Sequence, residues 1–149
     1  RLNNLEEHID ALCFAGSQKT NLLQLHMKDP SSGASHNSIG SSSNQFGEFD
    51  VNGKQSVIAI SLDDLDQIEG IASPNHIKLD VDGKELEILT GSTKVLKKVD
   101  SLLVEVEGKN LSENLGSIEN TIAESGLTED RDWRDKGSGR NRLYKRELS

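Results

Sequence analysis

Residues 76–107 constrain the fold of this chain more than any other stretch, because their pattern changes from strand to helix and back to strand. A short apolar run over residues 77–81 ends at Asp82-Gly83, a turn sequence. Beyond it, apolar side chains recur every three or four residues, which indicates a helix with one apolar face. Residues 102–106 form a second aliphatic run, typical of a strand buried on both faces. Because parallel strands need a long crossover, a βαβ unit is the simplest prediction.

Three acidic side chains, Asp80, Asp82 and Glu85, lie where the first strand of this unit hands over to the helix. Ligands of open parallel sheets bind beyond the carboxyl ends of the strands, so these carboxylates are candidate catalytic residues. Asp80 has the strongest claim because it stands between Leu79 and Val81, where a buried carboxylate requires a partner or a function. A structural interpretation stays open for the other two, since Asp82 suits a turn and Glu85 suits the positive end of a helix.

The composition limits the classes of partner. A net charge of −8 and 3% aromatic residues give neither the basic surface nor the stacking platforms that nucleic acid requires, so we expect no nucleic-acid partner. The 149 residues suit a single domain with its own core. No run approaches the roughly 20 apolar residues of a membrane span, and no signal-peptide pattern is present, which favours the cytoplasm. The single cysteine, Cys13, excludes an internal disulfide and a cysteine zinc site, and its apolar neighbours predict a core position.

The flanking segments predict further elements of an α/β domain. Ser61 is placed to cap a short helix over residues 62–65, in which Asp63 and Asp64 are structural acids. A loop rich in Ser, Gly and Asn and a hairpin that turns at Asn52-Gly53 form a predicted insertion over residues 29–56. The remaining predictions are strands at 9–14, 21–27 (an edge strand), 127–133 and 141–145, and a helix capped by Ser112 that ends at Gly126.

Residues 77–91, Ile-Lys-Leu-Asp-Val-Asp-Gly-Lys-Glu-Leu-Glu-Ile-Leu-Thr-Gly, resemble the signature IK-I-D-V-E/D-G-x-E-x-x-x-L-x-G of the FkbM family of S-adenosylmethionine-dependent methyltransferases. Residues 61–65 are similar to the family's T-L-D-D-L segment, 103–106 to its I-L-I-E strand, and 139–146 to its C-terminal strand. The resemblance implies the Rossmann-like sheet of class I methyltransferases and S-adenosyl-L-methionine as cofactor. It also implies transfer of a methyl group, most often to a hydroxyl of a sugar or another small molecule.

The resemblance implies catalytic roles for four acids. Asp80 is the first candidate for the base that accepts the hydroxyl proton, or for orienting the cofactor. Asp82 and Glu85 are expected to shape the acceptor side of the site. Glu105, at the end of the next strand, is expected to hydrogen-bond the acceptor or to steady the helix that follows Asp80.

Binding roles follow from the same resemblance. Ala15, Gly16 and Ser17 are similar to a small-residue step that lines the adenine side of the cofactor pocket, and small side chains allow a ring to approach the backbone. An ordinary turn is the alternative. His36 and Ser38 fall in the loop that lies near the substrate entrance in the family and are candidate acceptor contacts, with a solvated linker as the alternative.

The sequence departs from the family at its N-terminus. The Gly-rich turn after the first strand and the acid that ends the second, which hold the cofactor in the family, are absent before Asp10. The resemblance therefore predicts a methyltransferase sheet truncated at the N-terminus, inactive as a fragment, and no oligomeric state is predicted. Two other interpretations remain. One is a non-catalytic acidic α/β module that binds a partner through an open sheet edge, and the other is a cation-dependent glycosyl-transfer domain that uses Asp80-x-Asp82.

Overall fold

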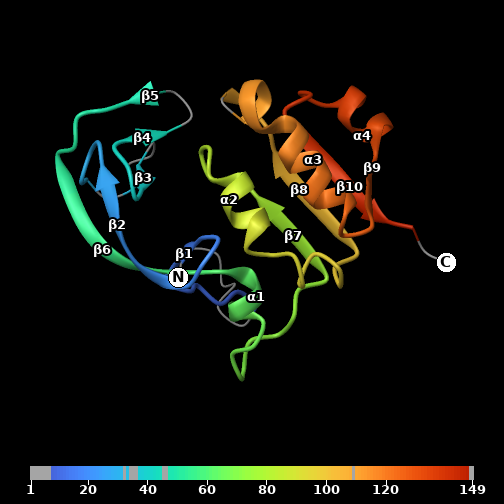
Figure 1. The fold of residues 1–149 in the computed structure, drawn as a ribbon, viewed down its shortest axis with the longest axis horizontal. Helices are drawn as coiled ribbons and strands as arrows, with labels where there is room; N and C mark the ends of the chain where they lie inside the picture. Colours follow the sequence, from blue (N-terminus) through green and yellow to red (C-terminus); the bar gives the residue numbers. More distant parts are fainter. Residues whose placement is uncertain (1–7, 32, 34–36, 45–46, 109, 148–149) are drawn as a thin grey trace.

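The computed structural model describes residues 8–147, apart from 32, 34–36, 45–46 and 109. Within these ranges the strands form two four-stranded sheets and one two-stranded sheet. Figure 1 shows the two larger sheets on opposite sides of the molecule, with α1 (Leu62–Leu65) and β1 (Ala15–Gly16) where they meet. The chain is therefore a mixed α/β protein, as its sequence pattern predicts.

The N-terminal sheet has the order β1-β6-β2-β3. β2 (Asn21–Met27) and β6 (Gly53–Ile60) form a long antiparallel ribbon, β1 runs parallel to β6, and β3 (Ser38–Ile39) lies on the other side of β2. Nearby, β4 (Ser43–Asn44) pairs with β5 (Gly47–Glu48). Most ribbon side chains are exposed or half-buried, and Ala59 and Ile60 at its end are the exceptions. The ribbon therefore has little core of its own.

The C-terminal sheet has the order β7-β8-β10-β9. β7 (His76–Leu79) and β8 (Ser101–Glu105) are parallel, while β10 (Asn141–Arg146) runs antiparallel to β8 and to β9 (Leu127–Glu129). The connection from β7 to β8 passes through α2 (Glu85–Thr90), which confirms the predicted βαβ unit. Among the described strands β7 pairs with β8 alone, so its other edge carries unpaired backbone groups.

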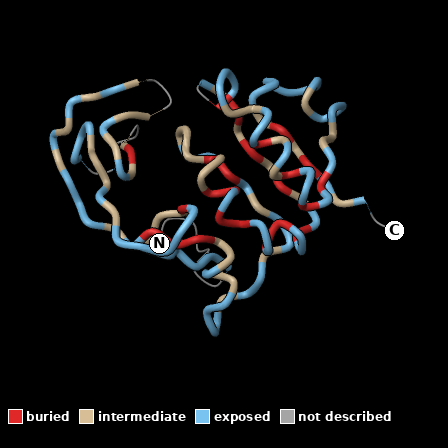
Figure 2. Tube along the Cα trace, viewed as in Figure 1, coloured by how far each residue is buried: buried red, intermediate tan, exposed pale blue. Residues whose placement is uncertain are grey.

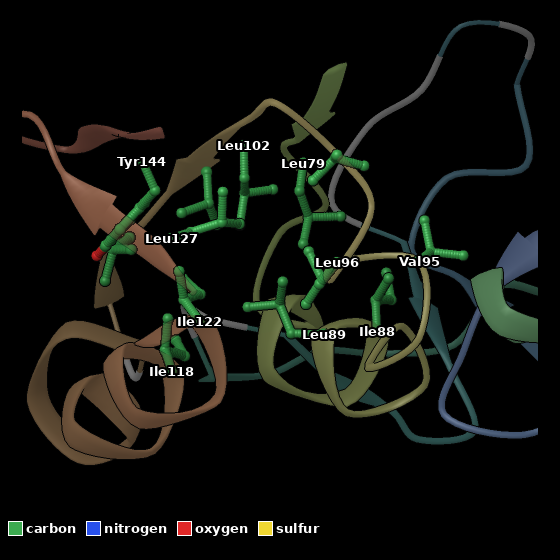
Figure 3. Close-up of a cluster of buried hydrophobic side chains, with 13 residues drawn as sticks. Leu79, Ile88, Leu89, Val95, Leu96, Leu102, Ile118, Ile122, Leu127 and Tyr144 are labelled. Carbon is green, nitrogen blue, oxygen red and sulfur yellow. The ribbon is translucent and has the colours of Figure 1, made fainter. Parts of the chain in front are cut away.

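One hydrophobic core joins this sheet to α2 and α3 (Leu115–Ala123), which follows a π-helix at Asn110–Asn114. Figure 3 shows Leu89, Leu96 and Ile118 pointing from the helical side toward Leu79 and Leu102 of the strands. A fully buried Leu or Ile contributes roughly 1.5–3 kcal/mol of hydrophobic free energy. Figure 2 places most of the buried positions in this half of the molecule. The C-terminal half thus supplies most of the stability.

The predicted helix cap and the structural role of its acids are confirmed. The Ser61 hydroxyl accepts a hydrogen bond from the Asp64 N–H at 3.1 Å. The Asp63 carboxylate accepts bonds from the N–H groups of Lys94 and Val95, both at 2.9 Å. Asp63 therefore ties α1 to the turns that follow α2.

Several predicted boundaries are wrong. Residues 9–14 are not a strand, because only Ala15 and Gly16 find a partner in β6. Cys13, placed in the core by its apolar neighbours, is exposed. The predicted hairpin turn at Asn52-Gly53 does not form, since Gly53 already pairs with Met27. β2 is not the predicted edge strand, because β6 and β3 flank it.

The C-terminal predictions are partly confirmed. β10 forms where residues 141–145 predicted the last strand. The strand predicted over residues 127–133 stops at Glu129, because the Asp130 carboxylate accepts a bond from the Trp133 N–H at 3.0 Å and starts α4 (Arg131–Lys136). α3 begins at Leu115 after the π-helix, so Ser112 is not its cap. The insertion predicted over residues 29–56 contains β3, β4, β5 and the start of β6.

Candidate active site

The carboxyl ends of β7 and β8 bring two carboxyl side chains together. Asp80 directly follows β7 and Glu105 is the last residue of β8. Leu79 pairs with Val104 and both point into the core, so the next residue on each strand lies on the opposite face of the sheet. The predicted burial of Asp80 within its strand is wrong, because its side chain is 42% exposed. The Asp80 carboxylate accepts a hydrogen bond from the Lys78 ammonium at 2.8 Å.

The environment separates the pKa values of the two carboxyls. The Lys78 ammonium lowers the pKa of Asp80. Burial, together with the charges of Asp80 and Glu107, raises the pKa of Glu105. Hydrogen bonding between the two carboxyls also lowers the pKa of Asp80 and raises the pKa of Glu105. Glu105 is therefore the carboxyl of the pair that favours the protonated form, and Asp80 is the one that favours the ionised form, a separation that suits acid–base chemistry.

Arg140 lies beside this pair, and sequence analysis did not identify it as a site residue. Its guanidinium donates a hydrogen bond from Nη1 to Glu107 Oε2 at 2.9 Å. Its positive charge lowers the pKa of both Asp80 and Glu105. Arg140 comes just before β10, whose first residue, Asn141, pairs with Glu105. The antiparallel pairing of β10 with β8 places Arg140 beside Glu105, and the local sequence does not reveal this pairing.

Glu85 does not face the solvent, in contrast to the role predicted for it. Its side chain is buried, with a relative exposure of 2%, which leaves no surface for contact with an acceptor. Its carboxylate accepts bonds from the N–H of Val81 at 3.1 Å and the N–H of Gly83 at 3.0 Å, and from the side-chain amide of Asn110. Burial raises the pKa of Glu85. Glu85 therefore holds the loop between β7 and α2 in place.

That loop contains a backbone conformation that requires support. Asp82 has a φ of 51°, in the left-handed region that is unfavourable for residues other than glycine. The bonds from Glu85 to the flanking N–H groups of Val81 and Gly83 hold it there. The turn that was the structural alternative for Asp82 is thus present, while its role on the acceptor side stays a prediction. The turn leaves Asp82 half-buried beside a pocket.

A cavity of about 300 Å³ lies between the N-terminal sheet and the first turn of α2. Its polar lining includes Ser17, Gln18, Asn21, Lys84 and Glu87, and its apolar lining consists of Leu23 and Ile39. The Ser17 hydroxyl donates to Glu87 Oε1, and the Lys84 ammonium donates to Glu87 Oε2, both at 3.1 Å.

The neighbouring small residues pack against α2. Ala15 and Gly16 form β1 and are not part of the cavity wall. A Cβ at Gly16 would lie 3.0 Å from the Ile88 side chain, so this glycine has a packing role of its own. Of the three residues predicted to line the adenine side, only Ser17 reaches the cavity.

A second, smaller pocket of about 120 Å³ adjoins the first. It brings Ser38 of β3 together with Asp82, two candidates for the acceptor side that are far apart in the sequence. Ser41 and Lys84 line both pockets. His36, the other acceptor candidate, lies outside the described residues.

The described part of the chain contains no group of three or more His, Cys, Asp or Glu side chains arranged to hold a metal ion. Within the same part of the chain, no helix has both the length and the apolar character required to cross a membrane.

The βαβ unit, the helices packed on its sheet and the carboxyl pair at the strand ends define an α/β domain with a candidate site at the carboxyl ends of its parallel strands. The family model of the methyltransferase FkbM domain matches residues 2–135, so the chain belongs to the FkbM methyltransferase family. Hexuronic acid methyltransferase AglP of Haloferax volcanii is 39% identical over 54 residues, a match that covers 36% of this chain and 23% of AglP. No solved structure matches the chain.

The pocket residues Lys84 and Glu87 were not predicted from the sequence. Their spacing of three residues at the start of a helix is a visible ion-pair signal, and the structure forms this pair. Ser41 and Asn114 gave no signal, because only the fold brings the segments after β3 and before α3 toward the loop at Asp82.

Proposed function

We propose that this protein is an S-adenosylmethionine-dependent methyltransferase that acts on a hydroxyl of a sugar or a small metabolite. The observation that carries the proposal is the Asp80–Glu105 carboxyl pair, which lies at the carboxyl ends of parallel strands in an FkbM domain. The 39% identity to a hexuronic acid methyltransferase over 54 residues supports a sugar as acceptor.

The chain's own residues account for the proton in such a reaction. An acceptor hydroxyl becomes acidic as its oxygen forms a bond to carbon, and a nearby carboxylate can then take its proton. Asp80 is the proposed base, held in place by Lys78. When both carboxyls are ionised, Asp80 accepts the proton of the acceptor hydroxyl. The proton is then shared with Glu105, whose raised pKa favours the protonated form.

The larger cavity suits the cofactor, which supplies an electrophilic methyl group when bound. Leu23 and Ile39 provide apolar walls for an aromatic base, while Ser17 and Glu87 offer hydroxyl and carboxylate partners for amino and hydroxyl groups. Ser17 and Glu87 are therefore the residues that we propose to hold its adenosine part. Asp80 is the proposed contact on the side of the reacting group.

The proposal includes a Rossmann-like sheet. β7 and β8 are its parallel strands, and the edge of β7 that β8 leaves open can accept a further parallel strand. A first strand with a Gly-rich turn, which lies next to this position in class I methyltransferases, would complete both the sheet and the cofactor site. We therefore expect residues 1–149 alone to bind the cofactor weakly or not at all.

Calorimetric titration with S-adenosylhomocysteine tests this proposal. One sample is the present chain, and the other carries in addition the first two strands of an FkbM relative upstream. We expect binding by the extended chain and transfer of labelled methyl to a glycoside. Asp80→Asn should reduce transfer by a factor of about 100 or more, within the range of general acid–base catalysis, and should leave the circular dichroism unchanged.

The matched control is Asp100→Asn, an exposed acid at the amino end of β8, which should transfer normally. No binding by either chain would contradict the methyltransferase proposal, and full activity of Asp80→Asn would contradict the assignment of the base. In the first case the better account is an acidic α/β module that binds a partner along the β7 edge. Cation-dependent binding of a sugar nucleotide would favour the glycosyl-transfer alternative.

A further inference from the structure

We propose that the smaller pocket is the acceptor subsite and that it binds a single sugar ring through the ring's hydroxyl groups. This pocket, called the serine pocket below, is lined by Ser38, Ser41, Ser43, Asp82, Lys84 and Asn114. The inference rests on the proposed function, because it names the substrate class and the residues that recognise it.

The chemistry of the lining favours a polyhydroxylated ligand. Hydroxyl groups both donate and accept hydrogen bonds, and three serines present them side by side. The Oγ atoms of Ser38 and Ser43 each lie 3.4 Å from Ser41 Oγ, at the long end of the hydrogen-bonding range. The Ser41 hydroxyl also donates to the Ser43 carbonyl oxygen at 3.2 Å. Ligand hydroxyls can replace the two long Oγ–Oγ contacts while this bond stays in place.

Two longer polar side chains complete the recognition set. The Lys84 ammonium has three N–H donors, and the Glu87 carboxylate takes one of them at 3.1 Å. The Asn114 amide donates to Asn110 Oδ1 at 3.0 Å, and Asn110 in turn donates to the buried Glu85. Asn114 is thereby oriented with its carbonyl oxygen available as an acceptor.

The polar wall favours a sugar ring over other small ligands. Among the described residues that line it, the serine pocket of about 120 Å³ has no aromatic or large apolar side chain, which suits a sugar ring better than a nucleobase or an acyl chain. It shares Ser41 and Lys84 with the larger cavity. Ligands in the two pockets would lie next to each other, as methyl transfer between them requires.

Titration of the labelled chain followed by amide NMR tests the inference. The probes are the methyl glycosides of glucose, galactose, mannose and glucuronic acid. We expect at least one of them to shift the amides of residues 38–44 and 82–84 in a saturable manner at millimolar concentration. Shifts confined to another part of the chain, or no saturable shift with any of the four glycosides, would overturn the inference.

Two variants and a matched control sharpen the result. Ser41→Ala removes one hydroxyl without adding bulk to the pocket, and Asn114→Ala removes the oriented amide. Each should weaken binding about tenfold or more, since a ligand hydroxyl then loses its partner. Ser56→Ala, on the exposed part of β6, should bind normally. The inference is wrong if both pocket variants keep a native amide spectrum and bind as tightly as the parent.

The calorimetric and NMR results separate the two proposals. If the extended chain binds S-adenosylhomocysteine and no glycoside responds, the acceptor subsite is wrong while the methyltransferase proposal stands. If a glycoside binds in the serine pocket and no chain binds S-adenosylhomocysteine, sugar binding by the pocket stands, while the methyl transfer and the pocket's role as acceptor subsite are wrong.

Discussion

Glu85 shows how a single residue can support a site without touching its ligands. A carboxylate that is 2% exposed would be costly to bury alone, and it is matched here by two backbone N–H groups and one amide. These bonds fix the loop that carries Asp80 and Asp82, including the left-handed backbone at Asp82. Glu85 is therefore a positioning residue.

Replacing Glu85 by Gln should destabilise the protein. The Nε2 group of Gln would face the N–H of Val81 or of Gly83, so one donor loses its acceptor at a cost of about 1–3 kcal/mol. Chemical denaturation measures this change, and Glu124→Gln on the surface is the control. Unchanged stability in Glu85→Gln would contradict the proposed role.

The pH dependence of stability gives an independent check on Glu85. Burial raises its pKa in the folded state, so the folded protein binds more protons than the unfolded chain just above the ordinary Glu value of 4.5. Stability from this group therefore falls as pH rises from about 4.5 through the raised pKa. We expect Glu85→Gln to flatten the curve of unfolding free energy against pH in that window, and an unchanged slope would contradict it.

The carboxyl pair can be tested with two substitutions of opposite sign. Arg140→Gln removes a positive charge that lowers the pKa of Asp80 and of Glu105, so both pKa values should rise. Glu107→Gln removes a negative charge that raises the pKa of Glu105, so that pKa should fall. Carbon-detected NMR of the carboxyl groups measures both directly. Shifts of the same sign in the two variants would show that the pair does not respond to these charges.

The packing of α2 on β1 depends on a close approach at Gly91, the residue that ends the helix. A Cβ there would lie 2.5 Å from the Ser17 carbonyl oxygen, so Gly91→Ala forces the backbone around Ser17 to move. We expect a loss of about 1–3 kcal/mol in unfolding free energy, as for other overpacked sites. Weaker binding in the larger cavity should accompany it, because Ser17 lines that cavity.

Gly116 of α3 provides the matched control for Gly91→Ala. A Cβ at this position meets no atom within 4 Å. Gly116→Ala should therefore stabilise the helix by up to about 1 kcal/mol. Equal effects of the two substitutions on thermal unfolding would contradict the packing argument.

The elements that were predictable from sequence are those whose signal is local. The βαβ unit follows from apolar periodicity, and α1 follows from the Ser61 cap. The predicted strand at 9–14 was wrong because a strand requires a neighbour, and alternation along one segment does not reveal whether a neighbour is present. α2 is shorter than its periodic pattern, since buried Val95, Leu96 and Val99 lie in turns beyond Thr90.

The candidate site was predictable to a similar degree. Asp80 and Glu105 were found because acids that follow apolar strands are visible in the sequence, and the parallel pairing brings them together. The burial of Glu85 was not visible, because it depends on Asn110 in a distant segment. The serine pocket combines three segments that lie 30 or more residues apart in the sequence, so no local motif could predict it.

At the scale of the whole molecule, the two halves differ in the source of their stability. The hydrophobic core lies between residues 79 and 144, whereas β2 and β6 have mostly exposed or half-buried side chains (Figure 2). The β2–β6 ribbon carries exposed Leu22 and Ile58, paired with each other, and joins the core mainly through β1 and α1. We therefore expect the ribbon to open at a lower free energy than β8 and β10.

Native-state hydrogen exchange measures that difference amide by amide. In the ribbon, amides should exchange through a local opening, and Leu102→Ala should leave the free energy of this opening nearly unchanged. In β8 and β10 the same substitution should lower the opening free energy by about 2–5 kcal/mol, because it leaves a cavity in the core. The serine pocket is formed half by the ribbon side and half by the C-terminal half, so a bound glycoside should slow exchange around Ser38. If the ribbon and β8 share one opening free energy in the parent and lose equal amounts in Leu102→Ala, the two halves unfold as one unit and this division is wrong.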